Sequence, residues 1–251
     1  MYHKNIVLTE AALSNVGERE NNEDYLGMFK DNDKCTYVLC DGLGGHGKGE
    51  VASKFVVESI IKSIYEKNMS VEDAIMEAQE GLLEKQRMEN DQKAMKTTVT
   101  CLQIENSKAK FVHVGDSRIY HFEDGEFKVR TMDHSVPQML VNIGDIKESD
   151  IRNHPDRSKL LRVVGVEWDS PKYQVIDNIE VTDKTSFLMC SDGFWELIEE
   201  DEMCATLINA DSPSGWLESM RKIVVDNGKG SNMDNYSAIA VFAREGNIQE
   251  N

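Results

Sequence analysis

Four short apolar strands that each carry an aspartate at one end constrain this chain more than any other feature of its sequence. In each case a mostly apolar run stops or begins within three residues of an aspartate. The runs are Tyr37–Cys40 before Asp41, Phe111–Val114 before Asp116, Phe187–Cys190 before Asp192, and Ser237–Phe242 after Asp234. If these strand ends converge in the fold, four carboxylates share a small volume.

Carboxylates that lie so close cannot all stay ionised without compensation, because like charges raise each other's pKa. A hard divalent cation supplies that compensation, and oxygen ligands suit Mg²⁺, Mn²⁺ or Ca²⁺. Gly42, directly after Asp41, lets a backbone carbonyl approach the same ion. The alternative is that Asp-Gly simply ends strands because it favours turns. Turn formation is a sufficient explanation for any single one of these aspartates, but it is a poor explanation for all four together.

The charge of the chain fits a cation as partner and disfavours two other classes. Asp and Glu number 45 against 28 Lys and Arg in 251 residues, which gives a formal net charge of -17. Such a surface repels polyanions, so we expect no nucleic-acid partner and no membrane partner. The sequence has no signal-peptide pattern and no apolar run near the ~18 residues that span a bilayer. We therefore expect a cytoplasmic protein.

The hydrophobic pattern predicts a single α+β domain over residues 1–251. Strands follow one another directly, which favours antiparallel pairing over repeated βαβ units. Helices come in two pairs, and each pair can cover one face of a β core. The two helices of the first pair have apolar residues at i, i+3, i+4 and i+7. We expect strands at 5–13, 25–29, 35–40, 98–104, 110–114, 118–122, 126–130, 173–177, 186–190 and 237–242, and helices at 49–67, after Ser70, near 200–209 and at 213–226.

A polar segment upstream, Arg19–Asp24, adds further candidate groups. Arg19 can bind a phosphate through two parallel hydrogen bonds, because its guanidinium is a planar fork of donors. Glu23 and Asp24 can reach a metal directly or through water. Taken alone, such a segment is more often a charged surface loop.

The glycine-rich loop Gly42–Gly49 imitates two nucleotide-binding motifs. It fits G-x-G-x-x-G, and it fits G-x-x-x-x-G-K except that Gly49 replaces the final Ser or Thr. The first motif requires a compact βαβ unit, whereas two helices are expected after this loop. Asp41 beside the loop would also repel a bare pyrophosphate. We therefore predict no nucleotide site here.

Taken together, the motifs resemble the metal-dependent type 2C family of protein serine/threonine phosphatases, in its bacterial single-domain form. The resemblance runs in order along nearly the whole chain. It is carried by Arg19 with Asn22–Asp24, Asp41–His46 with Gly49–Ser53, Thr97-Thr98, Gly115–Arg118, Asp133–Ser135, Ser191–Gly193 and Asp234-Asn235. Any one of these motifs is weak, but seven in this order are specific.

The resemblance implies a four-layer αββα sandwich, in which two antiparallel β-sheets are flanked by helix pairs. It also implies a binuclear Mg²⁺ or Mn²⁺ centre at one end of the sandwich, with residues 136–165 as a flap beside it. By matching position, Asp41 would bridge both ions and the Gly42 carbonyl would bind one of them. Asp192 and Asp234 would complete the shell of the other ion, and Glu23 would act through water.

Two further roles come from the same resemblance. Asp116, with Asp192, matches a third and weaker metal site, and Arg19 would bind the substrate phosphate. The implied reaction is direct hydrolysis of phosphoserine or phosphothreonine in proteins. A water that bridges the two metals becomes hydroxide-like near neutral pH and attacks phosphorus, so no covalent phosphoenzyme forms.

The leaving alkoxide needs a proton, and this chain departs from its eukaryotic relatives at that point. They carry a His two residues after the bridging Asp, where this chain has Leu43. His46 is the nearest imidazole and could donate through water, with a loop-shaping role as the alternative. Lys96 also departs from the family, which has Gly before the Thr-Thr pair. We expect a local backbone adjustment there rather than a loss of activity.

Two other functions stay open at this point. One is a pseudophosphatase that binds phosphoproteins without turnover, which the presence of Asp41, Asp192 and Asp234 disfavours. The other is a phosphohydrolase of small molecules or nucleotides on the same scaffold. Phosphoproteins are the predicted partners, and the resemblance implies opposition to a Ser/Thr kinase.

Overall fold

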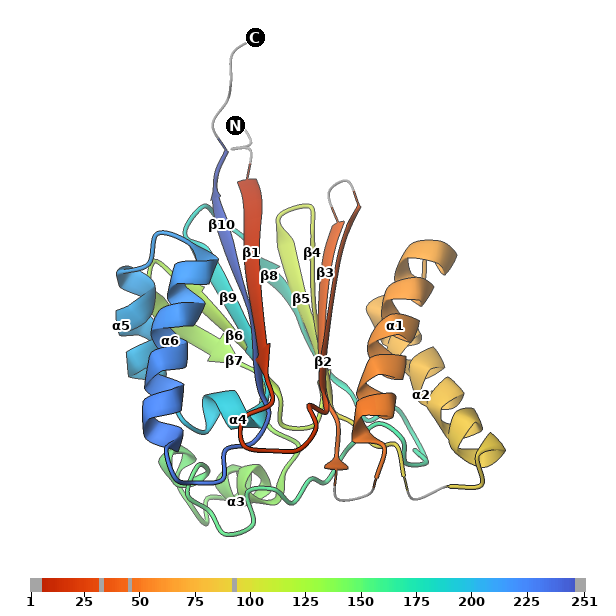
Figure 1. The fold of residues 1–251 in the computed structure, drawn as a ribbon. Coiled ribbons are helices and arrows are strands. Elements are labelled where there is room, and N and C mark those ends of the chain that lie inside the picture. The colour runs from red at the N-terminus through yellow and green to blue at the C-terminus, as the bar shows by residue number, and fades with distance from the viewer. Residues whose placement is uncertain (1–5, 32–33, 45–46, 92–93, 247–251) are drawn as a thin grey trace.

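Two antiparallel five-stranded sheets pack face to face in the computed structural model, which describes residues 6–31, 34–44, 47–91 and 94–246 (Figure 1). The first sheet has the order β1 (Ile6–Asn15), β10 (Tyr236–Glu245), β9 (Thr185–Cys190), β6 (Arg118–Glu123) and β7 (Glu126–Arg130). The second has the order β2 (Asp24–Asp31), β3 (Lys34–Asp41), β4 (Val99–Glu105), β5 (Lys108–Val114) and β8 (Gln174–Glu180). Every strand predicted from the pattern is present.

Helix pairs cover the two outer faces, which confirms the predicted αββα sandwich (Figure 1). The pair on the second sheet is α1 (Gly49–Lys67) and α2 (Val71–Met88), and the pair on the first is α5 (Glu200–Ile208) and α6 (Pro213–Gly228). The one-turn helix α4 (Asp192–Trp195) directly after β9 was not predicted. The segment 136–165, the expected flap, contains α3 (Val136–Ile143) and the 3₁₀ turn η2 (Glu148–Asp150).

Local turn and cap signals explain several element ends. Ser70 begins α2 as its N-cap, where its Oγ accepts a hydrogen bond from the backbone N–H of Asp73 at 3.1 Å. Asp124 and Gly125 join β6 to β7 with φ angles of 55° and 80°. A two-residue hairpin turn of type I′ needs positive φ at both positions, so this turn follows from the sequence.

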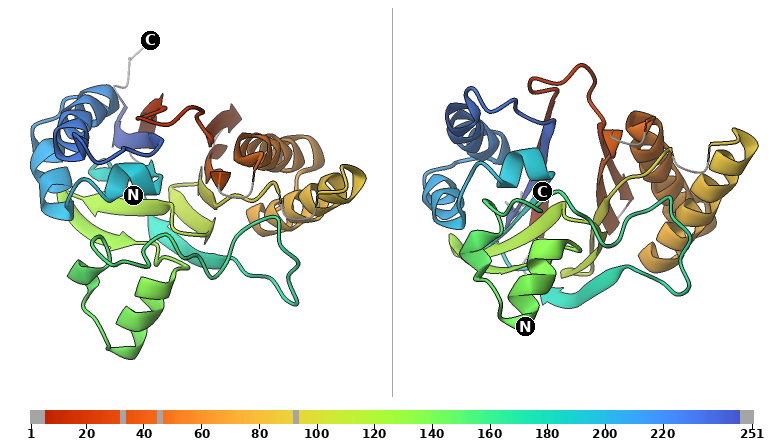
Figure 2. Two further views of the ribbon diagram at one scale, coloured as in Figure 1. Left: turned by 60° about the horizontal axis from the view of Figure 1, so that its bottom comes forward. Right: turned by 90° about the horizontal axis from the view of Figure 1, so that it is seen from below.

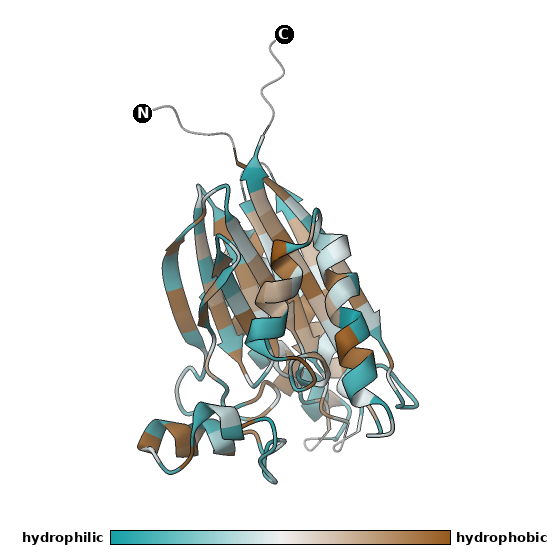
Figure 3. Ribbon diagram, turned by 90° about the vertical axis from the view of Figure 1, so that its left-hand side faces the viewer, coloured by the Kyte–Doolittle hydropathy of each residue, from teal (hydrophilic) through white to brown (hydrophobic). Residues whose placement is uncertain are grey.

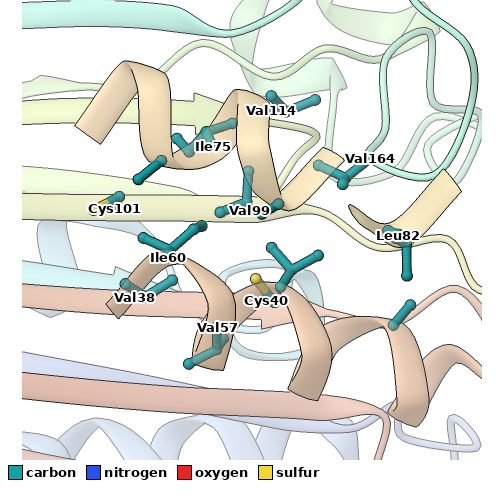
Figure 4. Close-up of a cluster of buried hydrophobic side chains, with 14 of the residues drawn as sticks. Val38, Cys40, Val57, Ile60, Ile75, Leu82, Val99, Cys101, Val114 and Val164 are labelled. Atoms are coloured by element: carbon teal, nitrogen blue, oxygen red, sulfur yellow. The ribbon is translucent and has the colours of Figure 1, made fainter. Parts of the chain in front are cut away.

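The hydrophobic core is divided between three layers, because both sheets are covered on both faces. Along β3, Tyr37 and Leu39 lie between the sheets, whereas Val38 and Cys40 lie under α1 and α2 (Figure 4). Successive side chains of a strand point to opposite faces, so a strand buried on both sides is apolar throughout. Figure 3 shows hydrophobic residues recurring along the strands of both sheets.

The end of the sandwich that holds α3 and α4 is the end relevant to function. Seen from below in Figure 2, α1 with α2 and α5 with α6 lie on opposite sides, and the chain between α3 and β8 crosses this end. That crossing segment is tied down where Thr97 and Val164 form a β-bridge. No helix in the described ranges is both long and apolar enough to cross a membrane.

Candidate metal centre

The four strand-end aspartates meet at one end of the sandwich. Asp41 is the last residue of β3, Asp116 follows β5, Asp192 begins α4, and Asp234 precedes β10. All four line one cavity of about 710 Å³. Because neighbouring strands run in opposite directions, the end of one strand lies beside the start of the next, and this brings distant parts of the sequence together.

The Thr-Thr pair fixes the backbone of Asp41. The Asp41 N–H donates to Thr98 Oγ1 at 3.0 Å, and the Asp41 carbonyl accepts from the Thr98 N–H at 2.8 Å. The Thr97 hydroxyl donates to the same carbonyl, also at 2.8 Å. The backbone carbonyl of Asp41 is thus fully engaged, and its side chain is the part of the residue left to bind a ligand.

Gly42 lies where no side chain fits. A Cβ at this position would be 2.3 Å from the Gly49 carbonyl oxygen and 2.8 Å from that of Glu23. The Gly42 N–H donates to the Glu23 carbonyl at 3.1 Å. The loop after Asp41 is therefore packed tightly between the start of α1 and the segment before β2, and Gly42 itself lines the cavity.

Asp24 is a fifth carboxylate of the cluster, and its importance was underestimated from the sequence. It is opposite Asp41 in the β2–β3 pair and only 6% exposed. Its Oδ2 accepts a hydrogen bond from Ser191 Oγ at 2.8 Å, while its Oδ1 has no hydrogen-bond partner. Burial, together with the nearby Asp192 and Asp234, raises the pKa of Asp24 to about 7.

Three of the strand-end aspartates, Asp41, Asp116 and Asp192, are perturbed in the same direction. Burial raises the pKa of Asp41 well above its usual value, and the neighbouring Asp24 and Asp192 add to this effect. The pKa of Asp116 is also raised well above its usual value, first by burial and then by Asp192. For Asp192, burial and then Asp234 raise the pKa to about 6. Ionisation of this cluster is therefore unfavourable unless positive charge is supplied.

The donor set fits hard divalent cations. Every candidate ligand is a carboxylate or carbonyl oxygen, which Mg²⁺ and Mn²⁺ prefer, and Asp24 Oδ1 is a buried acceptor without a partner. Within the described ranges, no three His, Cys, Asp or Glu side chains converge closely enough to enclose an ion by themselves.

Arg19 and Glu23 also line the cavity. Arg19 Nη2 donates to Asp234 Oδ2 at 2.9 Å, and both side chains are 45% exposed. Burial raises the pKa of Glu23, with smaller contributions from Glu50 and Asp234. His46, the candidate proton donor, lies outside the described residues, so its position relative to the cavity is not established.

A buried network that the sequence did not indicate supports Asp116. The indole N–H of Trp195 donates to the Asp116 carbonyl at 2.9 Å. Arg118 stacks on the Trp195 ring with its guanidinium carbon 3.4 Å from the ring centroid, and it forms a buried ion pair with Asp133 at 2.7 Å. Trp195 itself is buried. Only the fold brings these residues together, although Arg118 and Asp133 both belong to the motifs.

The segment 136–165 borders the cavity and is attached to α4 and the following residues. Its Ser158, Leu160, Leu161 and Val163 form part of the cavity wall. Arg152 donates to the carbonyls of Trp195 and Ile198, each at 3.1 Å, and Arg157 forms an ion pair with Glu196 at 3.0 Å. These contacts attach the segment to the end of the helix that carries Asp192 and to the residues that follow it.

Comparison with known proteins agrees with this architecture. The sequence model of the family described as Protein phosphatase 2C matches residues 13–224. The serine/threonine phosphatase stp of Listeria innocua is 33% identical over 197 residues, which cover 74% of this chain and 77% of the relative. The solved structure of the serine/threonine phosphatase Stp1 from Staphylococcus aureus is 27% identical, with a TM-score of 0.82 over 94% of this chain and 95% of that chain.

A further solved structure shares the fold and contains metal. It is the catalytic domain of the serine threonine protein phosphatase PstP in complex with 2 manganese ions, at 24% identity and a TM-score of 0.78. It covers 95% of this chain and 99% of that chain. Because the family match spans most of the chain and a relative above 30% identity covers about three quarters of it, this protein belongs to the protein phosphatase 2C family.

Proposed function

We propose that this chain hydrolyses phosphoserine and phosphothreonine in proteins with the help of two bound divalent cations. The observation that carries the proposal is the group of aspartates that line one cavity. Burial and neighbouring carboxylates raise the pKa values of Asp41, Asp116 and Asp192 among them, which calls for positive charge. The names of the relatives support protein phosphoserine and phosphothreonine as the substrate class. The two manganese ions of the PstP neighbour support the metal requirement.

In this proposal, Asp41 and the Gly42 carbonyl, with Asp192 and Asp234, hold two Mg²⁺ or Mn²⁺ ions, and Glu23 contributes through water. A third and weaker ion would use Asp116 together with Asp192. When bound, such ions lower the pKa of water and stabilise negative charge on phosphoryl oxygens. The support for these roles is that every one of these residues lines the same cavity.

Arg19 is the proposed ligand of the substrate phosphate. A planar guanidinium can donate two parallel hydrogen bonds to a phosphoryl group. Its present partner is Asp234, in an ion pair that is nearly half exposed, and exposed pairs of this kind contribute only about 0–1 kcal/mol. Exchange of that carboxylate for a substrate phosphate therefore costs little.

The cysteines argue against a covalent thiol mechanism. Burial raises the pKa of each of the five above its usual value. A nucleophilic cysteine needs the opposite, a lowered pKa that keeps the thiolate populated near neutral pH. This supports direct hydrolysis by water.

The test is hydrolysis of a phosphoserine peptide in the presence of Mn²⁺. We expect activity that is lost in excess EDTA, and a fall of at least about 100-fold in Asp41→Asn, since metal ions supply several kcal/mol of stabilisation to the transition state. Asp211→Asn, which removes an exposed carboxylate outside the cavity, should keep the wild-type rate. Activity that survives EDTA would contradict the metal mechanism.

The same assay separates the two other functions. Tight binding of the phosphopeptide without turnover would identify a pseudophosphatase, and faster turnover of free nucleotides would identify a small-molecule phosphohydrolase. A comparison of Mg²⁺ and Mn²⁺ in that assay addresses the preferred metal. Opposition to a Ser/Thr kinase is part of the proposal and can be tested by comparing phosphoproteins in cells with and without the active enzyme.

A further inference from the structure

Lys96 occupies a fixed place at the edge of the cavity. Its carbonyl accepts a hydrogen bond from the Leu43 N–H at 2.9 Å, which ties it to the loop after Asp41. The next residue, Thr97, forms β-bridges both to Gly42 and to Val164. The backbone of Lys96 is therefore held between the candidate metal loop and the segment that crosses the end of the sandwich, and Lys96 is one of the residues that line the cavity.

The charges around the cavity make Lys96 unusual. Among the described residues, the cavity is lined by six carboxylates and two cations, Arg19 and Lys96. Arg19 already pairs with Asp234. Lys96, although half-buried beside so many acids, forms no ion pair and no side-chain hydrogen bond within the part of the chain that the structure describes.

A lysine with a fixed backbone and an unengaged ammonium group is available to a ligand. Its flexible stem carries three donors and a compact positive charge, which suits an oxyanion. The acids around it are not its partners in this structure, and in the proposed function they are occupied by metal ions. The anion that enters such a cavity in every catalytic cycle is the phosphoryl group of the substrate.

We propose that Lys96 is a second phosphate-binding cation of this site, acting beside Arg19. The inference rests on the proposed phosphatase function and deepens it. It gives a function to the residue that departs from the glycine of the family pattern. It also identifies a second local source of positive charge, which a protein with a net charge of -17 needs in order to attract a phosphorylated substrate.

The test compares Lys96→Gln with the wild type on p-nitrophenyl phosphate and on a phosphoserine peptide, with saturating Mn²⁺ and low salt. We expect kcat/KM to fall about 10-fold on both substrates, equivalent to about 1.4 kcal/mol. The change should appear mainly in KM, because a cation that binds the phosphoryl group in ground state and transition state alike contributes uniform binding. The inhibition constant of inorganic phosphate should rise by a similar factor.

Three controls make the result specific. Lys96→Arg keeps the positive charge and should recover most of the affinity. Lys62→Gln removes an exposed charge from α1 and should change neither KM nor phosphate inhibition. The difference between the wild type and Lys96→Gln should shrink as salt is raised, since an ion pair near the surface is screened.

Several outcomes would overturn the inference. Unchanged KM and phosphate inhibition would show that Lys96 does not bind phosphate. A defect confined to the phosphopeptide would assign Lys96 to another part of the substrate, and a defect cured by more Mn²⁺ would assign it to metal binding.

A second measurement separates this inference from the proposed function. If the wild type hydrolyses neither substrate, the proposed function fails. In that case Lys96 can still be tested by phosphate binding. Inorganic phosphate that binds the Mn²⁺-loaded protein should raise its melting temperature, and this rise is compared between the wild type and Lys96→Gln. A smaller rise in Lys96→Gln supports the inference, and equal rises contradict it.

Discussion

Replacement of Asp192 by Asn should stabilise the metal-free protein at neutral pH, although it removes a proposed metal ligand. Burial and then the nearby Asp234 raise the pKa of Asp192 from 3.8 to about 6. Each pKa unit corresponds to about 1.4 kcal/mol. The ionised carboxylate therefore destabilises the metal-free folded state by up to about 3 kcal/mol, and Asn, which has nearly the same shape, carries no charge.

The effect has a defined pH window. Because the folded state holds the Asp192 proton more tightly than the unfolded state, ionisation is unfavourable to folding. The penalty is absent below about pH 4, the usual pKa of an aspartate, grows as pH rises, and is complete above the folded pKa of about 6. The advantage of Asp192→Asn should follow the same window.

The assay is urea unfolding in EDTA at pH 4.5 and pH 7.5, for the wild type, Asp192→Asn and the control Asp211→Asn. We expect the free energy of unfolding of Asp192→Asn to exceed that of the wild type by about 1–3 kcal/mol at pH 7.5 and by much less at pH 4.5. Asp211→Asn should match the wild type at both pH values, because its carboxylate is exposed.

Addition of Mn²⁺ should reverse the order of stability. A ligand that binds only the folded state stabilises it, and metal binding to carboxylates releases protons, so the wild type should gain most at pH 7.5. Asp192→Asn should gain less, since it lacks a proposed ligand. Two results for the metal-free protein would refute the electrostatic reasoning. One is that Asp192→Asn is less stable than the wild type at pH 7.5. The other is that its gain in the free energy of unfolding is the same at both pH values.

Three other substitutions test the surroundings of the cavity by urea unfolding. Gly42→Ala places a Cβ 2.3 Å from the Gly49 carbonyl oxygen, so it should lower the free energy of unfolding by at least about 2 kcal/mol. Trp195→Phe removes the donor to the buried Asp116 carbonyl and should lower it by about 1–3 kcal/mol. Arg157→Gln breaks a partly exposed ion pair to Glu196, directly after α4, so it should lower the free energy of unfolding by less than about 1 kcal/mol. It should also raise the KM for a phosphopeptide, because the neighbouring wall of the cavity loses this attachment.

Much of the fold could be predicted because its signals are local. The helix Gly49–Lys67 has apolar residues at helical spacing, and its observed bounds are the predicted ones. The turn at Asp124-Gly125 follows from two residues that tolerate positive φ. The cavity aspartates could be named in advance for a related reason, since each stands at the end of an apolar run and antiparallel strands bring such ends together.

What the sequence did not reveal depends on contacts between distant segments. Asp24 is the clearest case, since a polar segment gives no sign of its burial. It is buried because it pairs with Asp41 across the β2–β3 ladder and accepts a hydrogen bond from Ser191, which follows a strand of the other sheet. Likewise, α4 is a single turn and too short to produce a periodic pattern.

The pair formed by Arg19 and Asp234 connects the acidity of the cavity to the binding of substrate. Asp234 Oδ2 accepts the hydrogen bond of Arg19, so a metal ion bound to Asp234, as proposed, competes with the guanidinium for the same carboxylate. Because the pair is exposed and weak, the proposed ion would displace Arg19 at little cost and leave it free for the substrate phosphate. Metal binding would then change the cavity in two ways at once, since it would neutralise the carboxylates and release a phosphate-binding cation. The two events would be thermodynamically coupled, so a bound phosphate would in turn strengthen metal binding, and metal loading would favour entry of the anionic substrate.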